Sequence, residues 1–110
     1  MREVNIGGKD YRVVASPITL FFYKKEFKRD LLGDLLAMEA LEFDSSQFDG
    51  LAILQMAWAM IKTAKSGNLE AFEQWLAKLE YVDFEDTNMT TDIIEEIRKG
   101  FFRGGEQTQQ

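Results

Sequence analysis

Leu51-Ala-Ile-Leu-Gln-Met-Ala-Trp-Ala-Met-Ile61 is the stretch of sequence that decides the fold. It contains one polar residue, Gln55, and no charged residue. A helix that is apolar on every side must be enclosed by other parts of the protein, so we expect it at the centre of a helical bundle or in an interface. It is too short to cross a bilayer, which needs about 20 apolar residues.

The segment before this run predicts a helix over residues 17–38. Ser16-Pro17 is a good helix start, with Ser as the cap and Pro at the first helical position. Apolar residues recur at spacings of three and four and indicate one buried stripe: Leu20, Tyr23, Phe27, Leu31 and Leu35. Gly33 followed by Asp34 leaves open whether this helix is split into two.

The central helix itself is expected over residues 47–65. Ser46 and Asp49 have capping-box spacing ahead of it, and Ser66-Gly67-Asn68 should end it. A short helix over residues 69–79 should follow, then an acidic loop over residues 81–88. A last helix should begin near Thr90 or Thr91 and end at Gly100.

The first residues alternate around a glycine pair, which predicts a β-hairpin over residues 2–14 with Gly7-Gly8 in the turn. The fold class is therefore mainly α: a small bundle of about four to five helices with an N-terminal hairpin. At 110 residues the chain is long enough for one domain. We expect this domain over residues 1–103 and a disordered polar tail over 104–110.

The chain contains neither Cys nor His, which excludes disulfides, thiolate metal sites and the common His-based catalytic arrangements. Counted from Asp83 or from Asp86, the acidic loop lacks the Gly and Glu that a calcium loop needs at positions six and twelve. Glu95 and Glu96 are adjacent and diverge on a helix, and Glu95 instead has the spacing of a surface pair with Lys99. We therefore expect no enzyme activity, metal, cofactor or small-molecule substrate.

The net charge is −6, with 19 acidic and 13 basic residues. Residues 1–30 hold seven basic and four acidic residues, a balance of +3, and the remainder holds six basic and 15 acidic, a balance of −9. This charge argues against nucleic-acid binding. The asymmetry could favour head-to-tail self-association, or solvated faces could simply vary in charge. The N-terminus lacks the pattern of a secretion signal and the chain lacks a membrane span, so a cytoplasmic protein is expected.

The aromatic and methionine residues allow two interpretations. Trp58 and Trp75 are expected in the core. Met38, Met56 and Met60 suit either the core or an adaptable binding groove, because methionine repacks easily. Phe101 and Phe102 follow the expected terminator Gly100, and they either close the core or present an apolar patch to a partner.

Three segments resemble the tail assembly chaperones of long-tailed phages and prophages: Tyr23-Lys-Lys-Glu-Phe-Lys-Arg-Asp-Leu-Leu32, Leu54-Gln-Met-Ala-Trp-Ala-Met-Ile-Lys-Thr-Ala64 and Phe72-Glu-Gln-Trp-Leu-Ala-Lys-Leu79. The order of elements is also similar, and the resemblance covers roughly residues 4–103. Its motifs are mostly hydrophobic spacing and tryptophans, which are less specific than a metal or nucleotide signature.

The resemblance implies a non-enzymatic protein of the host cytoplasm that is absent from the mature virion. Such chaperones self-associate and keep the tape measure protein and tail tube protein soluble during tail assembly. Many are made in a short form and a form extended by a −1 ribosomal frameshift. The chain stops seven residues after Arg103, so the resemblance implies the short form.

We expect contacts between chains from aromatic residues at the edge of the predicted core and from the neighbouring arginine: Tyr23, Phe27, Phe101, Phe102 and Arg103. Two other functions fit a small helical domain. One is a structural tail completion or connector protein. The other is a DNA-binding regulator, for which no basic recognition helix is apparent.

Overall fold

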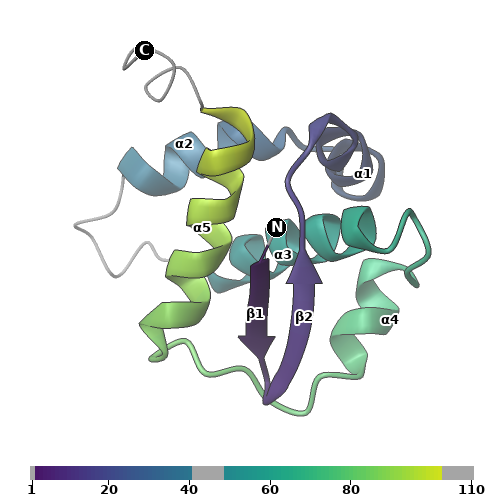
Figure 1. Ribbon diagram of the computed structural model, residues 1–110, viewed down its shortest axis with the longest axis vertical. Helices are drawn as coiled ribbons and strands as arrows, with labels where there is room; N and C mark the ends of the chain where they lie inside the picture. Colours follow the sequence, from purple (N-terminus) through teal and green to yellow (C-terminus); the bar gives the residue numbers. More distant parts are fainter. Residues whose placement is uncertain (1, 41–48, 103–110) are drawn as a thin grey trace.

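A computed structural model describes residues 2–40 and 49–102. This part of the chain is mainly helical, with an antiparallel two-stranded hairpin at its N-terminal end, as the sequence predicts (Figure 1). The elements in chain order are β1 (Arg2–Ile6), β2 (Lys9–Val13), α1 (Pro17–Phe27), α2 (Leu31–Ala40), α3 (Gly50–Ala64), α4 (Phe72–Ala77) and α5 (Thr87–Phe101).

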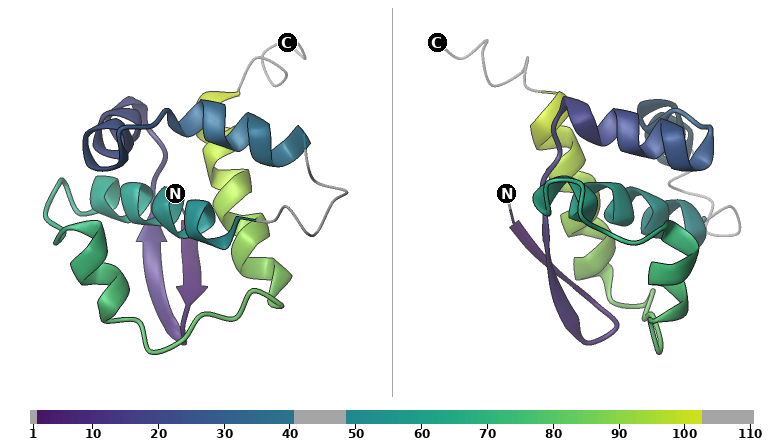
Figure 2. Two further views of the ribbon diagram at one scale, coloured as in Figure 1. Left: turned by 180° about the vertical axis from the view of Figure 1, so that it is seen from behind. Right: turned by 90° about the vertical axis from the view of Figure 1, so that its right-hand side faces the viewer.

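The hairpin has the register Val4↔Tyr11 and turns at Gly7 and Gly8, whose φ angles are 63° and 83°. Positive φ at both turn positions suits the right-handed twist of the two strands and favours glycine there. Alternate residues of the hairpin face the core, and Val4, Ile6 and Val13 are buried. The hairpin therefore packs one apolar face against α3 and α5 rather than standing alone (Figures 1 and 2).

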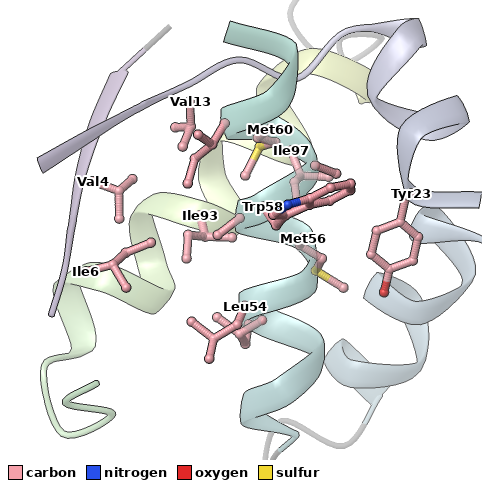
Figure 3. Packing of buried hydrophobic residues seen from close by; sticks show 14 of the residues in the cluster. Val4, Ile6, Val13, Tyr23, Leu54, Met56, Trp58, Met60, Ile93 and Ile97 are labelled. Carbon is pink, nitrogen blue, oxygen red and sulfur yellow. The ribbon is translucent and has the colours of Figure 1, made fainter. Parts of the chain in front are cut away.

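Helix α3 is the centre of the fold, as its apolar sequence predicts. The hairpin, α1, α4 and α5 all contact it (Figures 1 and 2). Its residues from Met56 to Met60 are fully buried, and Figure 3 shows Met56, Trp58 and Met60 among residues of the hairpin, α1 and α5. Trp58 and Trp75 are both core residues, as expected. Met56 and Met60 belong to the core, and Met38 packs partly against it.

The expected helix over residues 17–38 is two helices, and they separate before Gly33. Helix α1 ends at Phe27 because Lys28 adopts a left-handed conformation (φ 59°), and its N–H donates to the Lys24 carbonyl. Asp30 then accepts a hydrogen bond from the Gly33 N–H at 2.9 Å, which satisfies a free donor at the start of α2. Gly33 thus lies in the first turn of α2 rather than at a break.

Helices α3 and α4 begin with caps from different sources. Asp49 accepts from Ala52 N–H at 3.0 Å, while its expected capping-box partner Ser46 lies outside the described residues. Helix α3 ends at Ala64, and positive φ at Ser66 and Gly67 turns the chain where the sequence predicts. Helix α4 is shorter than expected, and the Glu26 carboxylate accepts from Phe72 N–H at 2.8 Å to cap it from α1.

Helix α5 differs from its expected bounds at both ends. Asp86 caps it at Thr87, a few residues before the expected start, by accepting from Asn88 N–H at 3.0 Å. Gly100 does not terminate the helix, which continues to Phe101. Gly100 is needed for a different reason: a Cβ there would lie 2.5 Å from the Ala15 carbonyl oxygen and 2.7 Å from the Ala15 Cβ.

Gly100→Ala should therefore destabilise the protein, although glycine to alanine inside a helix usually stabilises by about 0.5–1 kcal/mol. We expect the overlap with Ala15 to lower the free energy of unfolding by about 1–3 kcal/mol, as overpacking does. Gly33→Ala in α2 is the matched control, because the nearest atom to its Cβ would be Asp30 Oδ2, at 3.1 Å, which is a milder overlap with a side chain. Urea unfolding should rank Gly33→Ala clearly above Gly100→Ala, and a stabilised Gly100→Ala variant would contradict the packing.

Arg2 joins the start of the chain to α5. It lies 3.1 Å from Asp92, 3.1 Å from Glu95 and 3.4 Å from the nearly buried Glu96. Glu95, which the sequence paired with Lys99, thus faces Arg2. Part of the positive charge of the N-terminal third is therefore neutralised within the chain.

Candidate functional site

The residues expected to contact a partner lie in different surroundings. Tyr23 is fully buried, and Phe27 is partly buried between Tyr23, Trp58 and Phe72, with ring centroids 4.9, 5.5 and 5.0 Å from its own. The Tyr23 side chain therefore offers no surface to a partner in this conformation (Figure 3).

The C-terminal aromatics divide between the two interpretations of the sequence. Phe101 packs partly against the core, whereas Phe102 is 43% exposed, with the Arg98 guanidinium 6.0 Å from its ring centroid. Arg98 also pairs with Glu39 of α2. Phe102 therefore remains available to a partner, and Arg103 lies outside the described residues.

A polar network that the sequence did not predict lies where α1, α2 and α3 meet. The buried Tyr23 hydroxyl donates to Asp34 Oδ2 at 2.7 Å, and Arg29 donates twice to the same carboxylate at 2.8 and 2.6 Å. Arg29 and Asp34 line a surface pocket of about 260 Å³, together with Met38 and Gln55. Arg29 lies between α1 and α2, five residues before Asp34, which is not the i,i+3 or i,i+4 spacing of a helical ion pair. The sequence therefore carries no signal for this pair.

The charges and hydrogen bonds of this network keep Asp34 ionised and Tyr23 protonated, which stabilises the fold. The Arg29 hydrogen bonds hold the pKa of Asp34 below its ordinary value of 3.8, and the Tyr23 hydrogen bond adds to this. Burial, followed by the bond to Asp34, raises the pKa of Tyr23 above its ordinary value of 10.0. At neutral pH the carboxylate is thus ionised and the phenol protonated, an arrangement that makes both groups weak acid–base catalysts.

The folded protein should lose stability in acid partly through Asp34. A carboxyl group with a lowered pKa stabilises the fold above its unfolded pKa, and this contribution disappears as the pH falls through the folded pKa. We expect Asp34→Asn to flatten the fall of unfolding free energy between about pH 5 and pH 2. Urea titrations across this range measure it, with Glu73→Gln, an exposed carboxylate of α4, as the control. An unchanged acid slope in Asp34→Asn would contradict the network.

Two large apolar residues of α1 face outward. Phe21 is 55% exposed and Ile18 is 46% exposed. With 3.6 residues per turn, Phe21 lies about 160° around the helix axis from the buried Tyr23, so it faces away from the core. The same face carries Lys25, whose ammonium lies 5.9 Å from the Phe21 ring centroid. Lys28, the left-handed residue just after α1, lies beside it, since its ammonium donates to the Lys25 carbonyl at 3.0 Å. We call the exposed residues Ile18, Phe21, Lys24, Lys25 and Lys28 the basic face.

A second exposed group occupies residues 80–85, between α4 and α5. Tyr81 is 58% exposed and Phe84 is 39% exposed. The neighbouring carboxylates Glu80, Asp83 and Glu85 are also exposed. From here on, the acidic loop means these five residues, which overlap the loop expected over residues 81–88. The backbone of this segment is held in place, since Tyr81 approaches the hairpin turn at Gly7 and Phe84 lies against Gly50. Sequence reasoning treated this segment as a solvated loop and did not single out its aromatics.

No family model, curated protein or solved structure matches the chain. Across residues 2–40 and 49–102, no group of His, Cys, Asp and Glu could hold a metal ion. Within the same residues, no helix is both long and apolar enough to span a bilayer. The surfaces described above are therefore the features on which a function can be proposed.

Proposed function

We propose that this chain is a phage tail assembly chaperone, a non-enzymatic protein that self-associates and keeps the tape measure protein and the tail tube protein soluble while the tail assembles. It would act in the cytoplasm of the bacterial host and be absent from the mature virion.

One observation carries this proposal. The three segments that resemble tail assembly chaperones contribute to one aromatic cluster, in which Phe27 of the first segment contacts Trp58 of the second and Phe72 of the third. Trp58 and Phe72 also meet edge to face, with ring centroids 6.3 Å apart. The shared pattern therefore has one physical role, which is to build this core, and the exposed aromatic residues outside it supply surfaces for contacts.

The first test is to sequence the DNA around and beyond the stop codon. We expect a slippery heptamer near the codons of the C-terminal residues 104–110, an overlapping −1 frame and a very long downstream gene. The product of that gene should be insoluble when made alone and soluble when made together with this chain. A gene that stands alone, or a downstream product whose solubility does not change, would contradict the proposal.

Mass spectrometry of purified virions distinguishes the chaperone from a tail completion or connector protein. A chaperone should be missing from the particle even though it is abundant in the infected cell. A stoichiometric amount in the virion would identify a structural component instead.

A further inference from the structure

We propose that copies of this chain associate head to tail, with the basic face of α1 on one copy docking against the acidic loop of the next. This assembly would be the self-association included in the proposed function, on which it rests for its role in tail assembly. Its evidence is the chemistry and placement of two surfaces within one chain.

The first piece of evidence is that each surface combines apolar and charged groups. On the basic face the exposed Phe21 and Ile18 lie beside lysines, and in the acidic loop the exposed Tyr81 and Phe84 lie beside carboxylates. Aromatic side chains supply much of the contact energy in protein interfaces, and opposite charges around them select the partner and its orientation. The two surfaces are thus complementary in charge and alike in aromatic content.

The second piece of evidence is that the lysines of the basic face have no carboxylate partner within the described part of the chain, where the Lys28 ammonium donates only to the Lys25 carbonyl, at 3.0 Å. There, Lys24, Lys25 and Lys28 form no ion pair with an acidic residue, whereas Arg2, Arg29 and Arg98 all do. The arginines hold the chain together, and the lysines of α1 point to solvent. These lysines are therefore available to a second copy.

The third piece of evidence is the position of the two surfaces. Figure 1, in which the longest axis is vertical, has α1 near the top and the segment between α4 and α5 along the bottom, and Figure 2 agrees. A chain cannot close this contact on itself, because α1 and the segment between α4 and α5 lie on opposite sides of the molecule (Figures 1 and 2). Contacts between different surfaces of identical subunits produce rings or open filaments rather than two-fold dimers.

Light scattering of the purified chain during size-exclusion chromatography tests the assembly. We expect the average mass to rise with protein concentration at low salt and to fall toward that of one chain as salt increases, because the paired charges are exposed. Phe21→Ser should weaken association by about tenfold or more without changing the circular dichroism spectrum. A protein that stays a monomer at every concentration overturns the proposal.

A charge-reversal pair makes the test specific. Variant one carries Lys24→Glu and Lys25→Glu, and variant two carries Glu80→Lys and Glu85→Lys; each alone should be monomeric. When mixed, both kinds of contact become complementary again, so the mixture should regain the mass of the wild type. The control is Lys65→Glu with Lys99→Glu, which changes the net charge as variant one does but at two other exposed sites, just after α3 and on α5.

Each outcome decides one point. Recovery in the mixture, with a control that associates like the wild type, supports the proposed contact. A mixture that stays monomeric, or single variants that still associate, overturns it. The experiment uses the chain alone, so it is independent of the tape measure protein. A monomeric chain that still solubilises that protein would refute the head-to-tail contact and the self-association in the proposed function, but it would leave the solubilising role intact.

Discussion

Trp58→Ala is expected to lower the free energy of unfolding by about 3–5 kcal/mol, the usual cost of truncating a large buried aromatic residue. Trp58 has no exposed surface, and its ring meets the edges or faces of Phe27 and Phe72. Its indole N–H also donates to the Glu70 carbonyl at 2.9 Å, so truncation leaves that acceptor without this donor. The total free energy of unfolding of a small domain is about 5–15 kcal/mol, so this variant should lose much of its stability.

Urea unfolding followed by circular dichroism measures this change, and the fluorescence of the remaining Trp75 gives a second signal. Trp58→Phe is the matched control, because it keeps an aromatic ring in the cluster and loses the hydrogen bond to Glu70. We expect it to cost about 1–3 kcal/mol. If Trp58→Ala unfolded within 1 kcal/mol of the wild type, α3 would not be the centre of the fold.

The central position of α3 could be predicted from sequence because it follows from composition. A helical run without charge has no face to offer to water, so its neighbours must cover it on every side. The hairpin was equally clear, since Gly7 and Gly8 mark a turn that needs positive φ. In both cases a local pattern contains the whole physical reason.

The errors arose where a distant residue decides the local structure. Gly100 was interpreted as a helix terminator, whereas it is small because Ala15 packs against it. The start of α4 depends on a carboxylate of α1, since Glu26 caps Phe72. The left-handed Lys28 that separates α1 from α2 carries no sequence signal, because lysine rarely adopts this conformation.

The candidate contact surface was also predicted only where a local sequence pattern determines it. The spacing of apolar residues correctly placed Tyr23 and Phe27 in the buried stripe of α1. Ile18 and Phe21 face the other way, beside Lys25, but they were not recognised because large apolar residues in a helix are normally assigned to the core. They are exposed because α1 packs its opposite face against α3, and the sequence of α1 alone does not contain this information.

Tyr23→Ala separates folding from contact at this helix. Because Tyr23 is fully buried, its truncation should cost about 3–5 kcal/mol, like that of other core aromatics. Phe21→Ala, on the exposed face of the same helix, should stay within about 0.5 kcal/mol of the wild type. Urea unfolding at neutral pH measures both, and equal losses for the two variants would contradict the orientation of α1.

Tyr23→Phe isolates the hydroxyl and should cost about 1 kcal/mol, because Arg29 still satisfies Asp34. It should also flatten the alkaline end of the stability profile. A phenol whose pKa is raised by folding stabilises the protein below the unfolded pKa, near 10.0, and this contribution is lost as the pH rises further. Wild-type stability should thus fall above pH 10 more steeply than that of Tyr23→Phe. If Tyr23→Ala abolished binding to a partner, the loss would follow from unfolding, whereas the same loss in a stable Phe21→Ala variant would locate the contact on the basic face.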